Sequence, residues 1–338
     1  MKTFLLTAII FIATSFQLIE TPDEYKVRFG SVIPSDSPWE QGVDEYFKVV
    51  SEKSSGQIKF RKYLGGQLGG EVEMIKSIAM GALDAGAFSN AAVAEGLSIP
   101  ELQVFELPFL FDNDAEADAV MDVMFDKFYG ILEKKGVILV MWGTNGWRSF
   151  GTKGNPVLTP AELKGKKMRS QESDVYISFY KKMGATPNPL ATPDVLMALK
   201  TGMVDGFDQT PIFAVSTGWV TAINNFTLTK HIYQPGVIVL SKRFYNKLPE
   251  NMKKAILARD MRKSLQNTSR SLVRKDDEEI KNSIEADFGV NLIELSDAQR
   301  DVFKKAVQPV YTEMKDKIGA DLIGMVKAEI KKYREQNK

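Results

Sequence analysis

Short apolar runs alternate with segments of helical period from Tyr25 onward, a pattern typical of an α/β protein. The apolar runs have the length of strands, and the segments between them repeat their apolar residues on one helical face. Glycines at positions 56 and 136 mark two of the helix ends. The pattern predicts strands at 25–30, 57–63, 84–88 and 137–142 and helices at 37–56, 70–83 and 114–135.

The middle of the chain repeats this order with clearer start and stop signals. Thr159-Pro160-Ala161-Glu162 combines a capping box with proline at the first helical position, and Gly165 ends that short helix. The pattern then predicts strands at 166–170 and 204–209 and helices at 174–183 and 194–201.

A long stretch without glycine or proline, 250–288, carries apolar residues at near-helical multiples. As one helix it would reach about 58 Å at 1.5 Å per residue, which exceeds what a single small lobe needs. We therefore expect it to bridge two lobes, with or without a kink. The segment from Gly319 to the end reads as a charged terminal helix that frays.

Length and charge narrow the class of protein. A chain of 338 residues exceeds the usual size of a single core, so two lobes are expected. Lys and Arg total 44 against 43 Asp and Glu, and a net charge of +1 gives no field to hold nucleic acid or an anionic membrane. With no cysteine and one histidine, disulfides, thiolate ligands and histidine-rich metal sites are excluded.

The N-terminus has the pattern of a secretory signal. Lys2 precedes an uncharged, mostly apolar run that ends at Ala13, and the next charge is Glu20. That run is too short to span a bilayer, so we expect a signal peptide over about residues 1–22 and export of a soluble protein. A buried N-terminal strand or helix is the alternative.

Two arginines are candidates for binding an anion. Ligands of open α/β sheets collect at the carboxyl ends of strands, beside helix N-termini. Arg169 lies near the end of one predicted strand, and Arg148 lies between Trp147 and Phe150. A guanidinium group matches a carboxylate in a two-pronged contact. The alternative is that both are ordinary ion-paired surface arginines.

The stretch "VDGFDQTP" places Asp205 and Asp208 three residues apart at the end of a predicted strand. Side chains three apart on a strand point to opposite faces, which disfavours an acid/base pair, and further oxygen ligands for a metal are lacking. We expect Asp205 to accept backbone N–H bonds at the turn around Gly206. Asp208 or Gln209 would then project toward a cleft.

The sequence gives little support to other catalytic interpretations. His231 is the sole imidazole, and without a G-x-S-x-G motif a serine hydrolase has little support, so a structural or ligand-contacting role is favoured. The glycine-rich "YLGGQLGGE" lacks the Lys and Ser/Thr of a phosphate loop and reads as a tight turn that caps a helix at Glu71. Trp39, Trp147 and Phe213 are either lining of an aromatic-tolerant cleft or core.

Four ordered blocks resemble the substrate-binding proteins of tripartite ATP-independent periplasmic (TRAP) transporters, the dicarboxylate-binding DctP family. They are "YLGGQLGGEVEMIKSIAMGALDAG", "FELPFLFDN", "PAELKGKKMRSQES" with "GATPNPLATPDVLMALKTGMVDGFDQ", and "LTKHIYQPGVIVLSKRFYNKLP". The third block is the most specific, because an arginine after "LKGKK" and a later "ALKTGMVDG" form the signature of the family. The resemblance extends from Tyr25 to about Gly324.

The resemblance implies an α/β fold of two lobes, each a mixed sheet flanked by helices, joined by hinge strands and a long helix. The expected boundaries are 25–146 with 236–270 for the first lobe, 147–235 with 271–325 for the second, and a charged tail at 326–338.

The resemblance also implies a binding site and no catalytic residue, metal or cofactor. Arg169 matches the arginine that forms a salt bridge with the ligand carboxylate, and Arg148 matches a second arginine that assists it. Asp208 and Gln209 replace a glutamate and an asparagine of the family motif. The remaining candidate ligand-binding residues are Trp39, Glu71, Phe88, Ser89, Asn90, Phe213 and His231.

The expected function is that of a periplasmic solute receptor. It would bind a carboxylate-bearing organic acid between closing lobes and deliver it to the membrane subunits of a TRAP transporter, as a monomer. The alternatives are a periplasmic hydrolase that uses His231 and a receptor that serves a sensor. The sequence does not identify the acid.

Overall fold

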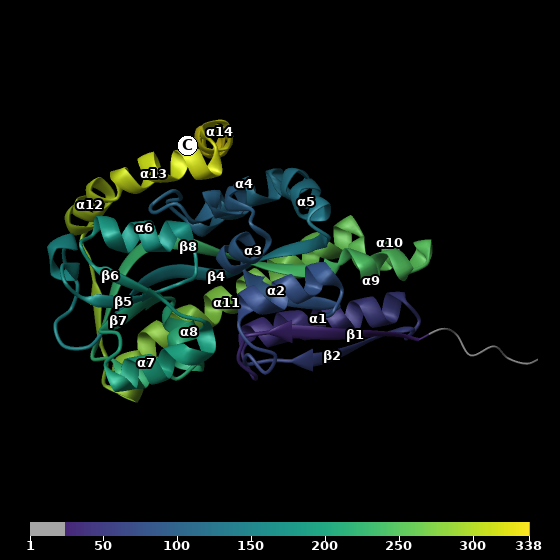
Figure 1. Ribbon diagram of the computed structural model, residues 1–338, viewed down its shortest axis with the longest axis horizontal. Helices are drawn as coiled ribbons and strands as arrows, with labels where there is room; N and C mark the ends of the chain where they lie inside the picture. The colour runs from purple at the N-terminus through teal and green to yellow at the C-terminus, as the bar shows by residue number, and fades with distance from the viewer. Residues whose placement is uncertain (1–23, 338) are drawn as a thin grey trace, which may run out of the picture.

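The computed structural model describes residues 24–337, so the expected signal peptide at residues 1–22 lies outside the described residues. The described part of the chain forms a mixed α/β fold around a nine-stranded sheet with helices on both faces (Figure 1). The α/β class expected from the alternating pattern is confirmed. Among these residues, none of the helices combines the length and apolarity needed to cross a membrane.

Two long antiparallel strands, β4 (Val137–Thr152) and β8 (Asn225–Ser241), run through both halves of the sheet. The strand order is β2-β1-β3-β8-β4-β7-β5-β6, and β9 pairs with the first residues of β8. The first lobe, drawn at the right of Figure 1, adds β1 (Tyr25–Ser31), β2 (Ile58–Tyr63) and β3 (Ala85–Ser89). The second lobe adds β5 (Lys167–Ser170), β6 (Thr186–Pro189), β7 (Gly206–Gln209) and β9 (Asn291–Glu294).

Helices cover the sheet of each lobe. Around the first lobe lie α1 (Pro38–Lys53), α2 (Glu71–Met80), α3 (Asn90–Leu97), the 3₁₀ helix η1 (Pro100–Glu106), α4 (Asp114–Val123), α5 (Phe125–Lys134), α9 (Lys242–Lys247) and α10 (Glu250–Leu257). Around the second lie η2 (Pro160–Leu163), α6 (Asp174–Lys182), η3 (Thr192–Asp194), α7 (Val195–Thr201), α8 (Pro211–Ser216), η4 (Trp219–Ala222), α12 (Asp297–Ala306) and α13 (Gln308–Ile318).

The passage of β4 and β8 between the lobes is irregular. Gly143 faces Gly236 across the pair, and the register shifts between Thr144 and Gly146. Gly146 has a φ of +95°, which glycine adopts without the strain that a Cβ would add. Such bulges bend and twist a strand pair. The two-stranded connection therefore departs from regular pairing at the point where the lobes meet.

A third connection is the 30-residue helix α11 (Arg259–Phe288), which contacts α1 in the first lobe and α8 in the second. The long helical segment predicted from the sequence is thus confirmed as a bridge between lobes. It is broken at Ala258, whose ψ of 120° is not helical and separates α10 from α11.

Two helical predictions were wrong in detail. The predicted helix at 114–135 is divided at Met124 into α4 and α5. The C-terminal helix α14 (Ala320–Gln336) does not fray, because Val326 and Ile330 are buried and Arg334 donates two hydrogen bonds to Glu116. Apolar contact with α4 and η1 and this ion pair hold the helix to the molecule.

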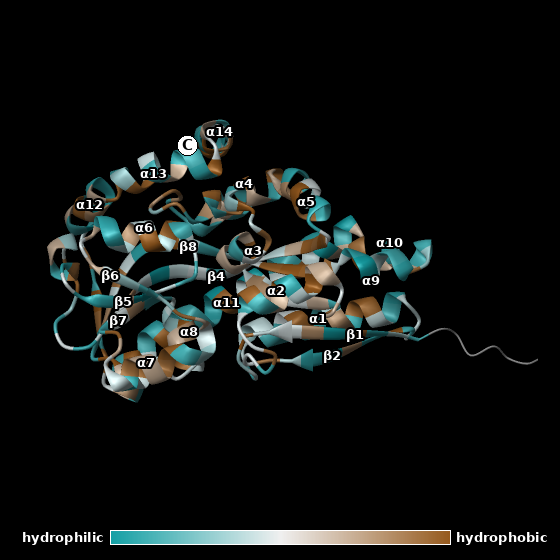
Figure 2. Cartoon of the chain, viewed as in Figure 1, coloured by the Kyte–Doolittle hydropathy of each residue, from teal (hydrophilic) through white to brown (hydrophobic). Residues whose placement is uncertain are grey.

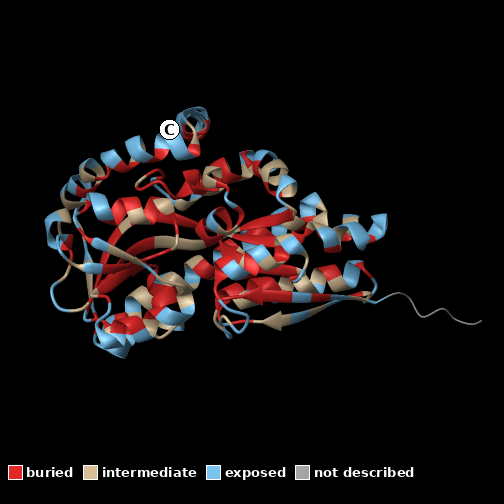
Figure 3. Cartoon of the chain, in the orientation of Figure 1, coloured by how far each residue is buried: buried red, intermediate tan, exposed pale blue. Residues whose placement is uncertain are grey.

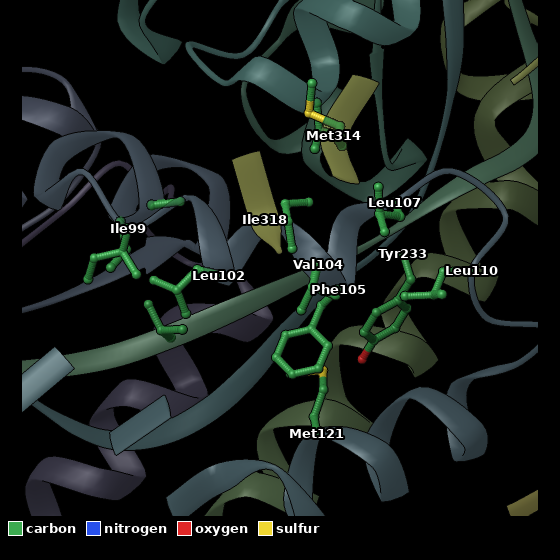
Figure 4. Close-up of a cluster of buried hydrophobic side chains, with 14 of the residues drawn as sticks. Ile99, Leu102, Val104, Phe105, Leu107, Leu110, Met121, Tyr233, Met314 and Ile318 are labelled. Atoms are coloured by element: carbon green, nitrogen blue, oxygen red, sulfur yellow. The ribbon is translucent and has the colours of Figure 1, made fainter. Parts of the chain in front are cut away.

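Buried residues concentrate on the strands and on the inner sides of the helices, while the outer helix faces are exposed (Figure 3). The outer helices α12 to α14 accordingly carry both hydrophilic and hydrophobic segments (Figure 2). Figure 4 shows part of the largest core, where Phe105 of η1 lies beside Met121 of α4, and Tyr233 of β8 lies beside Leu110.

Candidate functional site

A cavity lies between the lobes and is lined by residues of both. Its wall includes β3 and α1 of the first lobe, the β4–β8 crossing, α11, and residues of the second lobe. The apolar lining is Val32, Ile33, Trp39, Val43, Ala87, Phe88, Met141, Trp142, Phe213, Val237 and Ile238. The polar lining is Glu71, Ser89, Thr144, Asn145, Gln171, Thr192, Gln209 and Ser269, with Gly143 and Gly236.

A second, smaller cavity shares Glu71, Gln171 and Thr192 with the first and has Arg169 in its wall. The two cavities are therefore neighbours, and Arg169 lies in the smaller one. Arg169 comes from the end of β5, whose partner strands β6 and β7 are also short.

Arg169 is buried without an anionic partner among the described residues. Its Nε and Nη2 donate to the carbonyl oxygen of Leu190 at 3.2 and 2.8 Å, while Nη1 has no partner. The guanidinium carbon lies 5.3 Å from the ring centre of Trp219. Burial, and then repulsion from Arg148, lower the pKa of Arg169 to about 10. The protein thus holds a desolvated cation with a free donor at the edge of the cavity.

Arg148, in contrast, is fully engaged by protein. Nε donates to Oδ2 of Asp208 at 2.6 Å, Nη1 donates to Gln234 at 2.8 Å, and Nη2 donates to the carbonyl oxygen of Asp208. Both partners of this ion pair are wholly buried, and neither belongs to the cavity lining. Arg148 lies in the middle of β4 and not at the strand end that the sequence suggested, which corrects that prediction.

Asp208 has three polar neighbours. Besides Arg148, the hydroxyl of Tyr180 donates to Oδ1 at 2.7 Å, and Nε2 of His231 lies 3.5 Å from Oδ2. Burial alone would raise the pKa of Asp208, but the Arg148 charge and the neighbouring His231 hold it well below its usual range. Of the two side chains expected to project toward a cleft, Asp208 or Gln209, Asp208 is therefore an internal counterion.

Gln209, the next residue, lines the larger cavity, and its Oε1 accepts from the N–H of Thr210. The two neighbours on β7 therefore point to different places, one into the protein and one to the cavity. Asp205 accepts the N–H of Lys167 at 2.7 Å, so it binds the adjacent strand β5 and not the turn around Gly206 as predicted.

His231 lies between two aromatic rings and away from both cavities. The ring centres of Phe150 and Phe179 are 4.5 and 4.7 Å from it, and its side chain is wholly buried. Its Nδ1 lies 2.6 Å from the hydroxyl of Thr229. Burial lowers the pKa of His231, so the ring is neutral near pH 7. This environment suits a structural histidine and gives a substrate no access.

At the first-lobe wall, Glu71 and Ser89 are paired. Glu71 accepts the N–H of Ser89 at 2.6 Å and its hydroxyl at 3.0 Å. Burial raises the pKa of Glu71, and the two Ser89 bonds and the Arg169 charge oppose that shift in part. Phe88 lines the cavity beside them, while Asn90 donates to the carbonyl oxygen of Leu102 and to Glu106.

A hydrogen-bond relay that sequence reasoning missed joins the lobes. Gln171 of the second lobe donates to the Ser89 hydroxyl at 3.1 Å and accepts from Gln234 of β8 at 2.5 Å. The side-chain amide of Asn145 also donates to Oε1 of Gln234 at 2.9 Å. Gln171 follows Arg169 by two residues, a spacing that keeps extended side chains on one face and was the available signal.

Behind the relay, Glu106 of η1 is buried with three donors around it: Asn90 at 3.2 Å, Tyr176 at 3.1 Å and Gln234 at 3.4 Å. Burial raises the pKa of Glu106 to about 7, although the Asn90 bond and the Arg148 charge favour its ionised form. No local pattern in the sequence marks this residue, because its partners come from three separate elements, α3, α6 and β8.

The aromatic candidates from the sequence differ in whether they line the larger cavity. Trp39 and Phe213 both line the larger cavity, with ring centres 5.6 Å apart in an edge-to-face contact. Trp147 does not line it, and its indole N–H donates to Asp114 at 3.1 Å.

Across residues 24–337, no three or more acidic or histidine side chains are grouped so that they could hold a metal ion.

Comparisons with known proteins agree on one family. The model of the bacterial extracellular solute-binding proteins, family 7, matches residues 29–317. The C4-dicarboxylate-binding periplasmic protein DctP of Rhodobacter capsulatus is 25% identical, over 89% of this chain and 90% of that protein. Two crystal structures show how closely the fold agrees.

The sugar acid binding protein DctPAm of Advenella mimigardefordensis, solved with galactonate, has a TM-score of 0.86 and 28% identity, over 92% of this chain and 99% of that one. A TRAP periplasmic solute binding protein of a Polaromonas species, bound to D-erythronate, has a TM-score of 0.85 and 29% identity, over 90% of this chain and 99% of that one.

Proposed function

The chain belongs to family 7 of the bacterial extracellular solute-binding proteins, and from that premise we propose that Arg169 binds the carboxylate of an organic acid held between the two lobes. The protein is a solute-binding protein of the TRAP type and not an enzyme. The family members that it matches in structure are solute-binding proteins as well.

One observation carries the proposed site. Arg169 is buried, its pKa is lowered, and its Nη1 has no partner among the described residues, whereas Arg148 has the carboxylate of Asp208. A buried cation without a counterion is costly, and a ligand carboxylate in the neighbouring cavity would supply both the charge and the missing acceptor. Arg148 and Asp208, which are paired with each other outside the cavity lining, would support this site without contacting the ligand.

Binding would couple to closure of the lobes. We assign the first lobe to 25–146 with 236–270 and the second to 147–235 with 271–325. The register shift between Thr144 and Gly146, which pair with Pro235 and Gln234, supports the boundaries on β4 and β8. A ligand that contacts Arg169 in one lobe and the Ser89 region in the other gains affinity only when the lobes are together. The relay through Gln171 already spans that interface.

The wider role follows from family membership. We propose that the protein is exported by its N-terminal segment, acts in the periplasm as a monomer, and delivers the acid to TRAP membrane subunits. The hydrolase alternative has no support from His231, whose ring is enclosed by Phe150 and Phe179.

A thermal-shift screen with matched acids and amides tests the proposed site. A ligand at a hundred times its Kd stabilises the folded state by about 2.7 kcal/mol, which is readily measured. We expect at least one carboxylic acid to raise the Tm while its uncharged amide does not. Equal stabilisation by an acid and its amide would reject a site built on Arg169.

A further inference from the structure

This inference rests on the proposed function and concerns the part of the ligand beyond its carboxylate. We propose that the ligand is a monocarboxylate with an apolar body, of the branched aliphatic or aromatic type, and neither a dicarboxylate nor a polyhydroxylated sugar acid. Three properties of the larger cavity support this: its aromatic wall, its charge and the state of its polar groups.

The wall presents apolar surface on several sides. Trp39 and Phe213 meet edge to face, and Ile33 and Val43 line the same space. The only polar atom of the Trp39 side chain donates to the carbonyl oxygen of Thr144 at 2.9 Å, so the indole offers the ligand a hydrocarbon surface. Burial of an apolar body here contributes about 25 cal/mol per Å² removed from water.

The charge of the wall disfavours a second carboxylate. Among the described residues that line the larger cavity there is no lysine, arginine or histidine, and the one ionisable side chain is Glu71. A dicarboxylate with one end at Arg169 would bury its other end without a cation and beside an acidic group. An unpaired buried charge costs several kcal/mol, and the described lining offers no cation to offset it.

The polar groups of the wall are mostly engaged by protein. Thr144 accepts from the N–H of Gly146, Asn145 donates to Gln234, and Gln171 bonds at both ends of its amide. A sugar acid carries a hydroxyl on nearly every carbon, and each one left without a partner costs about 1–3 kcal/mol. The cavity has free capacity for a few polar substituents and not for a polyol.

The position of Arg169 fixes the orientation of the ligand. Glu71, Gln171 and Thr192 separate the cavity that contains Arg169 from the larger one. The Arg169 guanidinium lies over Trp219, and Trp219 packs on Phe213 at 5.6 Å, so the cation adjoins the aromatic wall. A carboxylate at Arg169 would therefore direct the rest of the molecule into the apolar cavity.

Calorimetry on protein that has been unfolded, dialysed and refolded to remove bound ligand tests the inference. The probes are phenylacetate and 4-methylpentanoate for the apolar class, and succinate and D-glucuronate for the polar classes. We expect the better apolar acid to bind at least about tenfold more tightly than either polar acid, as burial of two methylene equivalents would give.

A pair of isosteric variants locates the effect. Val43 lines the cavity, whereas Val50, on the same helix α1, is buried away from it. The Val43→Thr change should weaken phenylacetate binding about threefold to tenfold, because its hydroxyl meets an apolar ligand. The Val50→Thr change should leave the affinity unaltered.

The outcomes separate the inference from the proposed function. Tighter binding of succinate or glucuronate that depends on Arg169 would overturn the apolar assignment and support the carboxylate site. An absence of binding by all four acids would also overturn the assignment. The proposed function would then be tested independently by whether a carboxylic acid is released from the purified protein.

Discussion

Arg148 and Asp208 form an ion pair in which Nε lies 2.6 Å from Oδ2 and neither side chain reaches solvent. Arg169 has no such partner and bonds only the carbonyl oxygen of Leu190. The two arginines that the sequence suggested as a pair thus have different environments. One is neutralised within the protein, and the other retains a free donor beside a cavity.

Replacement of Arg169 with methionine should abolish acid binding at little cost to the fold. Loss of a buried, charge-assisted contact weakens binding by about 2–5 kcal/mol, or at least thirtyfold. Without ligand, the free energy of unfolding should stay the same or increase, because the change removes an unpaired buried cation and retains the apolar stem. Calorimetry and urea denaturation measure the two effects, with the exposed Arg61→Met as control. Strong destabilisation with intact affinity would mean that Arg169 is structural.

The Asp208→Asn variant should lose about 3–5 kcal/mol of unfolding free energy, because it leaves Arg148 buried without a carboxylate. The pKa of Asp208 is depressed, so its contribution is present above the unfolded pKa of about 4 and is lost only as the pH falls through the lower folded value. Urea denaturation at neutral pH measures the loss. The exposed Asp316→Asn on α13 is the matched control, and equal stability of the two variants would refute the role of the pair.

Acid binding should strengthen as the pH falls toward the raised pKa of Glu71, as long as the carboxylic ligand itself remains ionised. Burial raises the pKa of Glu71, so its neutral form is populated at a higher pH than that of an ordinary glutamate, and the loss of its charge removes repulsion of the incoming anion. Calorimetry at several pH values measures the slope. The Glu71→Gln variant keeps an acceptor for the N–H of Ser89 and should flatten the profile, whereas the exposed Glu52→Gln should not. A profile unchanged in Glu71→Gln would assign the dependence to another group.

Removal of the amide of Gln171 should weaken binding without unfolding the protein. Gln171→Ala breaks the bond to Ser89 that joins the lobes, and one such bond contributes about 0.5–1.5 kcal/mol, or about twofold to tenfold in affinity. Small-angle scattering of the unliganded variant should also show a larger radius of gyration if this bond favours closure. An unchanged radius and affinity would show that the relay does not couple to the ligand.

The sequence predicted most of the helices and the short strands of the fold, because each carries its own period and its own end signals. It did not predict β4 and β8 as continuous strands. Their crossing contains Gly143, Gly146, Pro235 and Gly236, which individually read as breakers, and only the pairing across the sheet makes them one ladder. The break at Ala258 has no local signal at all.

Site residues could be predicted where they follow the end of a strand. They could not be predicted where their position depends on pairing between distant parts of the chain. Gln209 was found because it ends β7, whereas Phe88 and Ser89, at the end of β3, were candidates only through the resemblance to the family. Gln234 was missed because its role depends on the register that places it opposite Gly146, far away in the sequence. His231 was placed near the pocket by resemblance, and its enclosure by Phe150 and Phe179 appears only in the packed core.

The central claim is that Arg169 holds a ligand by its carboxylate. Mass spectrometry of the small molecules released by denaturing wild-type and Arg169→Met protein, purified in parallel, tests it most directly. We expect a carboxylic acid from the wild type, in an amount comparable to the protein, and none from the variant. Equal recovery of the same acid from both proteins, or release from the wild type of a compound without a carboxylate, would contradict the claim.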